Sequence, residues 1–140
     1  MDDVALTHLI CALLGRVPGW HYDPDPDAEP YPAGSVGIFY GAVQPRPVRA
    51  IGVRVYWSSD DELHVRRAQL TIRGGEYDPT GADELAGVVF AVLHGLSRVG
   101  GISDARRISH GSLGADNTGR ESRSDNYQFI LDNPEAIRYE

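Results

Sequence analysis

Apolar and polar side chains alternate between residues 66 and 73. The apolar members of the alternation are Ala68, Leu70 and Ile72. The polar members are Arg67, Gln69, Thr71 and Arg73. A period of two along the chain predicts a β-strand with one buried face and one polar face.

After Gly74-Gly75 the hydrophobic period lengthens. Apolar residues now recur every three or four positions, at Leu85, Val88, Val89, Val92 and Leu96. This spacing predicts an amphipathic helix whose apolar stripe packs on the apolar face of the preceding strand. Thr80 is expected to cap the helix, because its hydroxyl can accept a hydrogen bond from an amide of the first turn.

The same reading along the rest of the chain predicts one more helix and four more strands. The helix covers residues 2–17, with Asp2 or Asp3 as its cap. The strands are residues 36–43, 50–58, 105–112 and 124–131. Strand 50–58 is expected to turn Ile51, Val53, Val55 and Trp57 toward the core and to form an antiparallel hairpin with strand 66–73.

The resulting order is helix, three strands, helix, two strands. It predicts a single α+β domain over residues 1–140, with a mainly antiparallel or mixed sheet of about five strands and both helices on one face. The polar C-terminal residues 132–140 are expected to fray.

Residues 18–35 contain five prolines and four acids. Proline at this density excludes regular structure through most of the segment, so we expect an extended acidic surface loop, anchored at its start by Trp20 and Tyr22. Its alternating aspartates do not form a calcium-binding loop, since Ala28 and Glu29 stand where such a loop needs a glycine. No metal ligand is therefore predicted.

The chain has a formal net charge of −7, and its 13 cationic residues are all arginine. The acidic balance argues against a protein that grips nucleic-acid backbones. Arginine suits protein interfaces through bidentate contacts to carboxylates. Coding bias in a GC-rich genome nevertheless explains the complete absence of lysine better than functional selection does. No apolar run is long enough to span a membrane, and Asp2-Asp3 is a poor start for a secretory signal. Cys11, the single cysteine, is expected to be a buried thiol. The protein is thus expected to act inside a cell or in a particle assembled there.

Catalytic motifs are missing from the sequence. The five histidines are His8, His21, His64, His94 and His110. No pair of them has metal-ligand spacing, and there is no GxSxG elbow or phosphate-binding glycine loop. We predict no catalytic residue and no cofactor. A small enzyme that uses His110 with serine or aspartate neighbours is the remaining alternative of that kind.

Four segments together resemble the small tail terminator (minor capsid) proteins of long-tailed bacteriophages, particularly those of actinobacteria. They are GIFYGAV with AIGVRVY (37–43 and 50–56), RRAQLTIRG (66–74), ADELAGVVFAVLHGL (82–96) and SLGADNTGRESRSDNYQFIL (112–131). Their order and spacing, rather than any one of them, carry the resemblance.

The resemblance implies a structural virion protein without catalytic residues. Such proteins form a ring, typically six-fold, at the head-proximal end of the tail tube, where the ring ends tube polymerisation and offers a surface for head–tail joining. The implied partners are further copies of the chain, the tail tube protein and the neck proteins. The implied place is the tail–neck junction of a virion assembled in the host cytoplasm, with DNA passing through the lumen without sequence-specific binding. Another phage neck protein, such as a head-closure or tail-completion connector, is the nearest alternative.

Interface candidates follow from the polar strand face and the loops. Subunit contacts are predicted between arginine-bearing strand positions, Arg54, Arg67, Gln69 and Arg73, and the acids Asp60, Asp61 and Glu62 of the next copy. Loops 21–35 and 112–123 are long enough to reach a partner. Their candidate residues are Asp25, Asp27, Asp116, Asn117 and Arg120.

Overall fold

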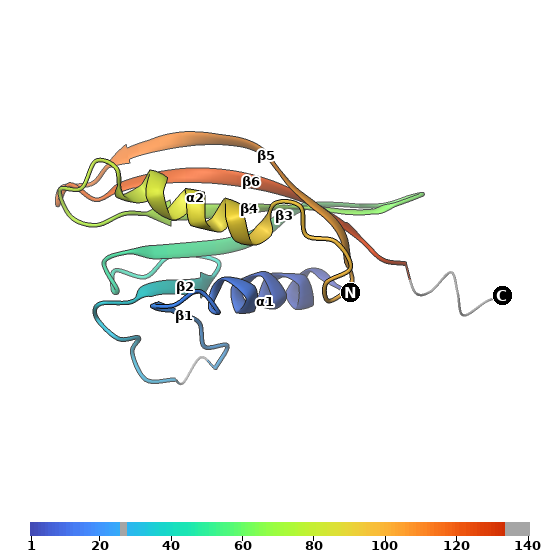
Figure 1. Cartoon of the computed structure of the whole chain (residues 1–140), viewed down its shortest axis with the longest axis horizontal. Helices are drawn as coiled ribbons and strands as arrows, with labels where there is room; N and C mark the ends of the chain where they lie inside the picture. The colour runs from blue at the N-terminus through green and yellow to red at the C-terminus, as the bar shows by residue number, and fades with distance from the viewer. Residues whose placement is uncertain (26–27, 134–140) are drawn as a thin grey trace.

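Two helices and a six-stranded mixed sheet make up the part of the chain that the computed structural model describes, residues 1–25 and 28–133 (Figure 1). The elements in chain order are α1 (Asp3–Leu14), β1 (Trp20–His21), β2 (Val36–Tyr40), β3 (Ala50–Asp60), β4 (His64–Arg73), α2 (Gly81–Leu93), β5 (Ile102–Ala115) and β6 (Glu121–Leu131). The strands lie side by side in the order β1-β2-β3-β4-β6-β5.

Helix α1 begins as its sequence predicts and ends earlier. Asp2 is the N-cap, and its Oδ1 accepts a hydrogen bond from the Ala5 amide at 2.7 Å. The helix ends at Leu14 rather than at residue 17, because the chain turns at Gly15. Its buried face carries Leu6, Thr7, Ile10, Cys11, Leu13 and Leu14.

The sheet is antiparallel on one side and parallel on the other. The predicted β3–β4 hairpin is confirmed, and β6 pairs antiparallel with both β4 and β5. Strands β1, β2 and β3 run parallel to one another. The short strand β1 is the sixth strand, which the sequence did not predict, because two residues are too few to show a hydrophobic period. Its Trp20 packs against the core, as does nearby Tyr22.

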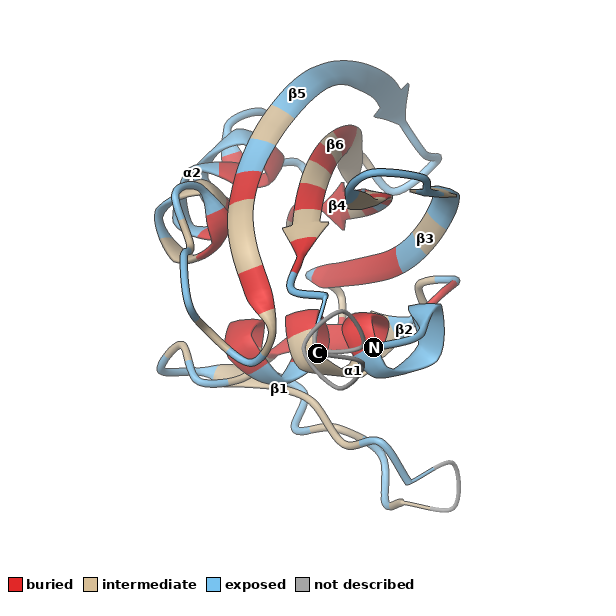
Figure 2. Ribbon diagram, turned by 90° about the vertical axis from the view of Figure 1, so that its right-hand side faces the viewer, coloured by how far each residue is buried: buried red, intermediate tan, exposed pale blue. Residues whose placement is uncertain are grey.

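Both helices cover the same face of the sheet, as predicted, and one core lies between the layers. Figure 2 shows the curved sheet and the helices enclosing the buried segments. Fully buried members come from both helices and from every strand except β1. They include Leu6, Ile10, Leu14, Ile38, Ile51, Leu70, Ile72, Val89, Leu93, Ile102, Tyr127 and Phe129. The α+β class is confirmed.

The β3–β4 ladder contains a bulge that changes the direction of Trp57. Val55 pairs with Ala68 on the core face, but the next pair is Trp57 with Arg67, so the register slips by one residue on β3. An extra residue in one strand moves all later side chains to the opposite face. The prediction that Trp57 faces the core is therefore wrong: its ring is 42% exposed and lies on the uncovered face.

Strands β5 and β6 are longer than predicted, so loop 112–123 is mostly hairpin. The strands extend to Ala115 and from Glu121, which leaves only residues 116–120 as the turn. Strand β5 is an edge strand, and its pairing with β6 is irregular at three places. This segment therefore reaches outward as paired strands rather than as a free loop.

Helix α2 begins at the predicted place, but Thr80 does not cap it in the predicted way. The Thr80 side chain makes no cap hydrogen bond, and its hydroxyl instead contacts the carboxylates of Asp78 and Glu84 at 3.2 and 3.1 Å. Val88, predicted in the apolar stripe, is 38% exposed, whereas Leu85 and Val89 are buried.

Candidate assembly surfaces

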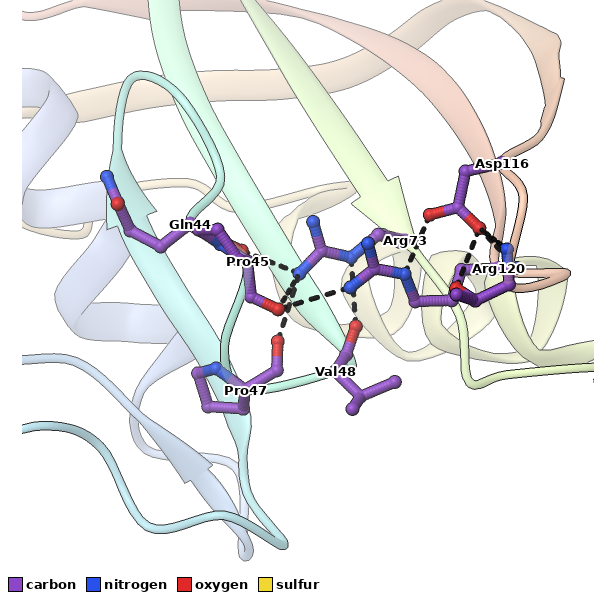
Figure 3. A network of polar contacts seen from close by, with 8 residues as sticks. Gln44, Pro45, Pro47, Val48, Arg73, Asp116 and Arg120 are labelled. Carbon is purple, nitrogen blue, oxygen red and sulfur yellow. Dashed lines mark hydrogen bonds and ion pairs between the residues drawn. The ribbon is translucent and has the colours of Figure 1, made fainter.

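Arg73, at the end of β4, holds a neighbouring loop in place (Figure 3). Its guanidinium donates to the backbone carbonyls of four residues of the β2–β3 connection: Gln44, Pro45, Pro47 and Val48. The residue is only 7% exposed. Burial lowers the pKa of the guanidinium, and the nearby Arg120 cation acts in the same direction. The expectation that Arg73 stands on an open polar face is thus wrong, because the loop folds back over that end of the face.

Arg120 links a second loop to the same place. Its Nε donates to the Asp116 carboxylate at 2.7 Å and its Nη1 to the Pro45 carbonyl at 3.1 Å. The Asp116 carboxylate also accepts from the amides of Thr118 and Arg120. The hydrogen bond from the Arg120 amide, together with that from its guanidinium, lowers the pKa of the Asp116 carboxyl. Of the three partner candidates in this turn, only Asn117 is both exposed and without such a contact in the described structure.

A third loop, which leads into α2, joins the other two. The Tyr77 amide donates to the Gly119 carbonyl at 3.1 Å. Tyr77 has a left-handed backbone with φ of 53°, and its side chain is 78% exposed. Gly119 leaves room for the ring, because a Cβ there would lie 2.5 Å from Cδ1 of Tyr77. We call residues 44–49, 75–80 and 116–120 together the loop cluster.

The loop cluster exposes residues that the sequence reading did not select. Arg46 and Arg49 are exposed on the 44–49 loop. The Arg49 guanidinium donates to the Gly34 carbonyl at 3.0 Å, and Arg46 borders the cleft beside the acidic loop. Neither a periodic pattern nor a motif marks these positions. The only local signal is the Pro-Arg-Pro segment at residues 45–47, which indicates an irregular connection.

The turn of the β3–β4 hairpin lies at the opposite end of the sheet. We call residues 60–63 the acidic tip. Asp61, Glu62 and Leu63 are exposed, with Leu63 at 57%. Asp60 is held differently, since its carboxylate accepts from Arg66 at 2.7 Å and contacts His64 at 2.6 Å. These hydrogen bonds, that from Arg66 first, lower the pKa of the Asp60 carboxyl.

The base of the acidic tip is fixed to α1. Arg66 is 7% exposed and bridges two carboxylates, those of Asp3 and Asp60, each at 2.7 Å. Because the Arg66 guanidinium is buried, its ion pairs restrain the two aspartates more than ion pairs of an exposed arginine would. The tip therefore projects from a rigid base.

Between the two ends, the uncovered sheet face carries Arg54, Arg67 and Gln69. Arg67 lies over the Trp57 ring, 4.6 Å from its centroid, and donates to Gln128 at 3.1 Å. Gln69 donates to the Ser124 hydroxyl at 2.8 Å. Arg54 is exposed, with its guanidinium beside Gly41. The structure places these three candidates on one face, as predicted.

The acidic loop bounds a cleft of about 590 Å³. Tyr31 holds the loop, because its hydroxyl donates to the Ile38 carbonyl at 3.0 Å and its ring stacks on Phe39. The Asp25 amide donates to the Asp23 carboxylate at 2.9 Å. Asp27, the other candidate of this loop, lies outside the described residues. Among the described residues no group of three or more His, Cys, Asp or Glu side chains is placed to hold a metal ion.

Within residues 1–25 and 28–133, the His110 imidazole makes no hydrogen bond or ion pair with an acid. Its neighbour across the ladder is Asp125, whose fully buried carboxylate is bound by Arg123 at 2.7 Å and by Arg107 at 3.5 Å. These two arginines satisfy the carboxylate, and Arg123 also reaches Asp83 on α2 at 2.9 Å. The cluster anchors the helix to the sheet.

Two further sequence expectations concern Cys11 and the apolar character of the helices. Cys11 is buried, as predicted, and burial raises the pKa of its thiol to about 12. In the described part of the chain, neither helix has the length and apolar character that crossing a membrane requires.

The fold and these surfaces define a small α+β protein with helices on one sheet face, an uncovered polar face, and exposed loops at the two ends of the sheet. The family model of the bacteriophage tail terminator protein matches residues 23–133. The chain belongs to this family and is a structural protein of the phage virion. The resemblance seen in the sequence is thereby confirmed.

Solved structures with a similar fold include a chain of a gene transfer agent particle. A chain of the structure titled "Virion of native gene transfer agent (GTA) particle" superposes with a TM-score of 0.52 at 14% identity, covering 89% of this chain and 85% of that chain. No curated protein matches the chain in sequence. At such low identity the likeness concerns the fold alone.

Proposed function

We propose that the protein caps the head-proximal end of the phage tail tube as a homo-oligomeric ring, most simply a hexamer. The ring ends tube polymerisation and provides the surface on which the head is joined, at the tail–neck junction of a virion assembled in the host cytoplasm. The observation that carries this proposal is the family match over residues 23–133.

The distribution of side chains supports a ring. A closed ring of identical subunits needs two different patches on each copy that fit one another. The chain carries acids at Asp60, Asp61 and Glu62, and arginines at other places on its surface. Arg54, Arg67 and Gln69 on the uncovered face remain candidates for subunit contacts, whereas Arg73 is assigned to the fold.

The net charge of −7 suits a channel for DNA. An acidic wall repels phosphates, so a duplex slides through without being held, and no base is read. Asp25 and Asn117, on surface loops, are the candidates for contacts with the tube protein or the neck proteins.

The test is a phage that lacks the gene. We expect tail tubes of irregular, excessive length that do not join heads, and normal virions when the protein is supplied from a plasmid. Negative-stain electron microscopy measures both. Tails of normal length without the protein would refute the capping function, and normal tails that fail to join heads would identify a head-closure protein instead.

A second measurement addresses catalysis. A variant with both His94→Ala and His110→Ala should restore virions as well as the unmodified protein, because neither imidazole takes part in assembly. Loss of virions with a folded double variant would favour the enzyme alternative.

A further inference from the structure

We propose that the acidic tip of one copy binds the loop cluster of the next copy, with Leu63 packed against Tyr77 and with Asp61 and Glu62 facing Arg46 and Arg49. This contact rests on the proposed ring, and it names the surfaces that build it.

The acidic tip carries side chains that a partner could bind. Asp61 and Glu62 make no hydrogen bond or ion pair within the described residues, so both carboxylates are available. Leu63 is 57% exposed at the end of a two-stranded arm that extends past the helices (Figure 1). An exposed leucine beside acids at a projecting turn is unfavourable in water, and burying it under a partner is favourable.

The loop cluster has the chemistry of a receptor. Tyrosine and arginine are the residues that most often dominate binding energy at protein interfaces. Tyr77, Arg46 and Arg49 are each exposed on a loop of the cluster, and the Arg49 guanidinium is held by the Gly34 carbonyl at 3.0 Å. Arg46 makes no hydrogen bond or ion pair within the described residues. Tyr77 has a left-handed backbone, and its amide donates to the Gly119 carbonyl at 3.1 Å, so its exposed ring projects from a turn that is held in place.

The loop cluster is also prepared for binding. Arg73 and Arg120 tie residues 44–48 to the sheet and to the 116–120 turn through hydrogen bonds of 2.6–3.4 Å. A surface that is already ordered loses little conformational entropy when it binds. The network of Figure 3 thereby supports the exposed side chains from behind.

The two surfaces cannot meet within one molecule. Strand β3 begins beside the loop cluster at Ala50 and reaches the acidic tip at Asp60, so about 33 Å of strand separates them. Two acidic tips repel each other, and so do two arginine-bearing clusters. The complementary occupant is therefore a second copy, joined head to tail, and a head-to-tail contact generates a ring when the rotation between successive copies closes.

Charge exchange tests the contact in the phage. The tip variant Asp61→Arg/Glu62→Arg and the cluster variant Arg46→Glu/Arg49→Glu should each lower the yield of capped tails at least about tenfold, since each places like charges opposite one another. A chain with all four changes should recover the yield, because it restores opposite charges with exchanged signs. Arg98→Glu is the matched control, the reversal of an exposed charge outside both surfaces, and should cap tails normally.

A cross-link tests the geometry directly. In tails assembled with a Leu63→Cys/Tyr77→Cys chain, oxidation should produce disulfide-linked multimers, while Leu63→Cys/Arg98→Cys should stay monomeric. Cys11 does not interfere, because it is buried. Circular dichroism confirms that every variant is folded.

Three results would overturn the contact: normal capping by folded tip or cluster variants, failure of the fourfold variant to recover, or no multimers from the Leu63/Tyr77 cysteine pair. Each is distinct from a failure of the proposed function, which appears as normal tails in the complete absence of the gene.

Discussion

Replacing Arg73 by alanine removes the donor that holds the β2–β3 connection. The guanidinium donates to the carbonyls of Val48 at 2.9 Å, Gln44 at 2.6 Å and Pro47 at 3.0 Å. A hydrogen bond to a charged group contributes about 1.5–3 kcal/mol net, and an abandoned buried carbonyl costs about 1–3 kcal/mol. These contributions are not additive, because one side chain makes all the bonds. In addition, water can hydrate the carbonyls of the released loop. We expect Arg73→Ala to lower the free energy of unfolding by about 3 kcal/mol.

The measurement is urea or thermal unfolding followed by far-ultraviolet circular dichroism. A loss of about 3 kcal/mol corresponds to a Tm lower by roughly 10 °C in a chain of this size. Arg54→Ala is the matched control, because Arg54 is an exposed arginine on the same face, and its loss should change stability by less than about 0.5 kcal/mol. Arg73→Lys should lie between the two, since an ammonium cannot reproduce the planar fork.

Equal destabilisation by Arg73→Ala and Arg54→Ala would refute the reasoning. It would mean that the loop is held by its own packing and that the guanidinium adds nothing. A large loss in Arg73→Ala that Arg73→Lys fully restores would show that charge, rather than the fork geometry, holds the loop.

Three further predictions concern a cap, a carboxyl and a thiol. Asp2→Ala should lower the free energy of unfolding, measured in urea, by about 1 kcal/mol, because the Asp2 carboxylate caps α1. Thr80→Ala should lower it by less than about 0.5 kcal/mol, because Thr80 makes no cap hydrogen bond. Equal losses would contradict the assignment of caps. Asp116 has a depressed pKa in the folded protein, so its contribution is fully present above the unfolded pKa of about 3.9 and is lost as pH falls toward the folded value. The Tm of Asp116→Asn should therefore fall less than that of the unmodified protein between about pH 5 and pH 2, and parallel curves would exclude the carboxyl as a source of acid sensitivity. Cys11 should react with a thiol reagent at about pH 8 only after denaturation, because burial raises its pKa to about 12; rapid labelling of the native protein would disprove its burial.

The core was predictable where the hydrophobic period and the strand register place the same side chains on the covered face of the sheet. Ala68, Leu70 and Ile72 are all fully buried, as the alternation predicts. Trp57 shows the limit, because its apolar character fits the core while the bulge after Val55 turns it outward. A bulge is decided by the register of the paired strand, and a single strand's sequence does not contain that information.

The surfaces were predictable only in part, for a similar reason. The alternation placed Arg67 and Arg73 on one face, yet the first stays partly accessible while a loop from 25 to 29 residues away covers the second. The exposure of a polar residue depends on which distant segment crosses it. Tyr77 is a second example, because its exposed ring lies against Gly119, a residue of another turn.

The β3–β4 ladder has one more consequence, for how the distance between the molecule's two ends can change. Its paired residues run from Ala50 with Arg73 to Asp60 with His64. The length of the ladder is therefore set by the number of paired residues, at about 3.3 Å per residue. Adding one residue to each strand would move every later side chain to the other face and expose the core. Where no bulge such as the one after Val55 intervenes, the ladder therefore lengthens by two residues per strand, about 7 Å, at a time. The distance between the two ends of the subunit therefore changes in fixed steps, and a change in loop length does not alter it.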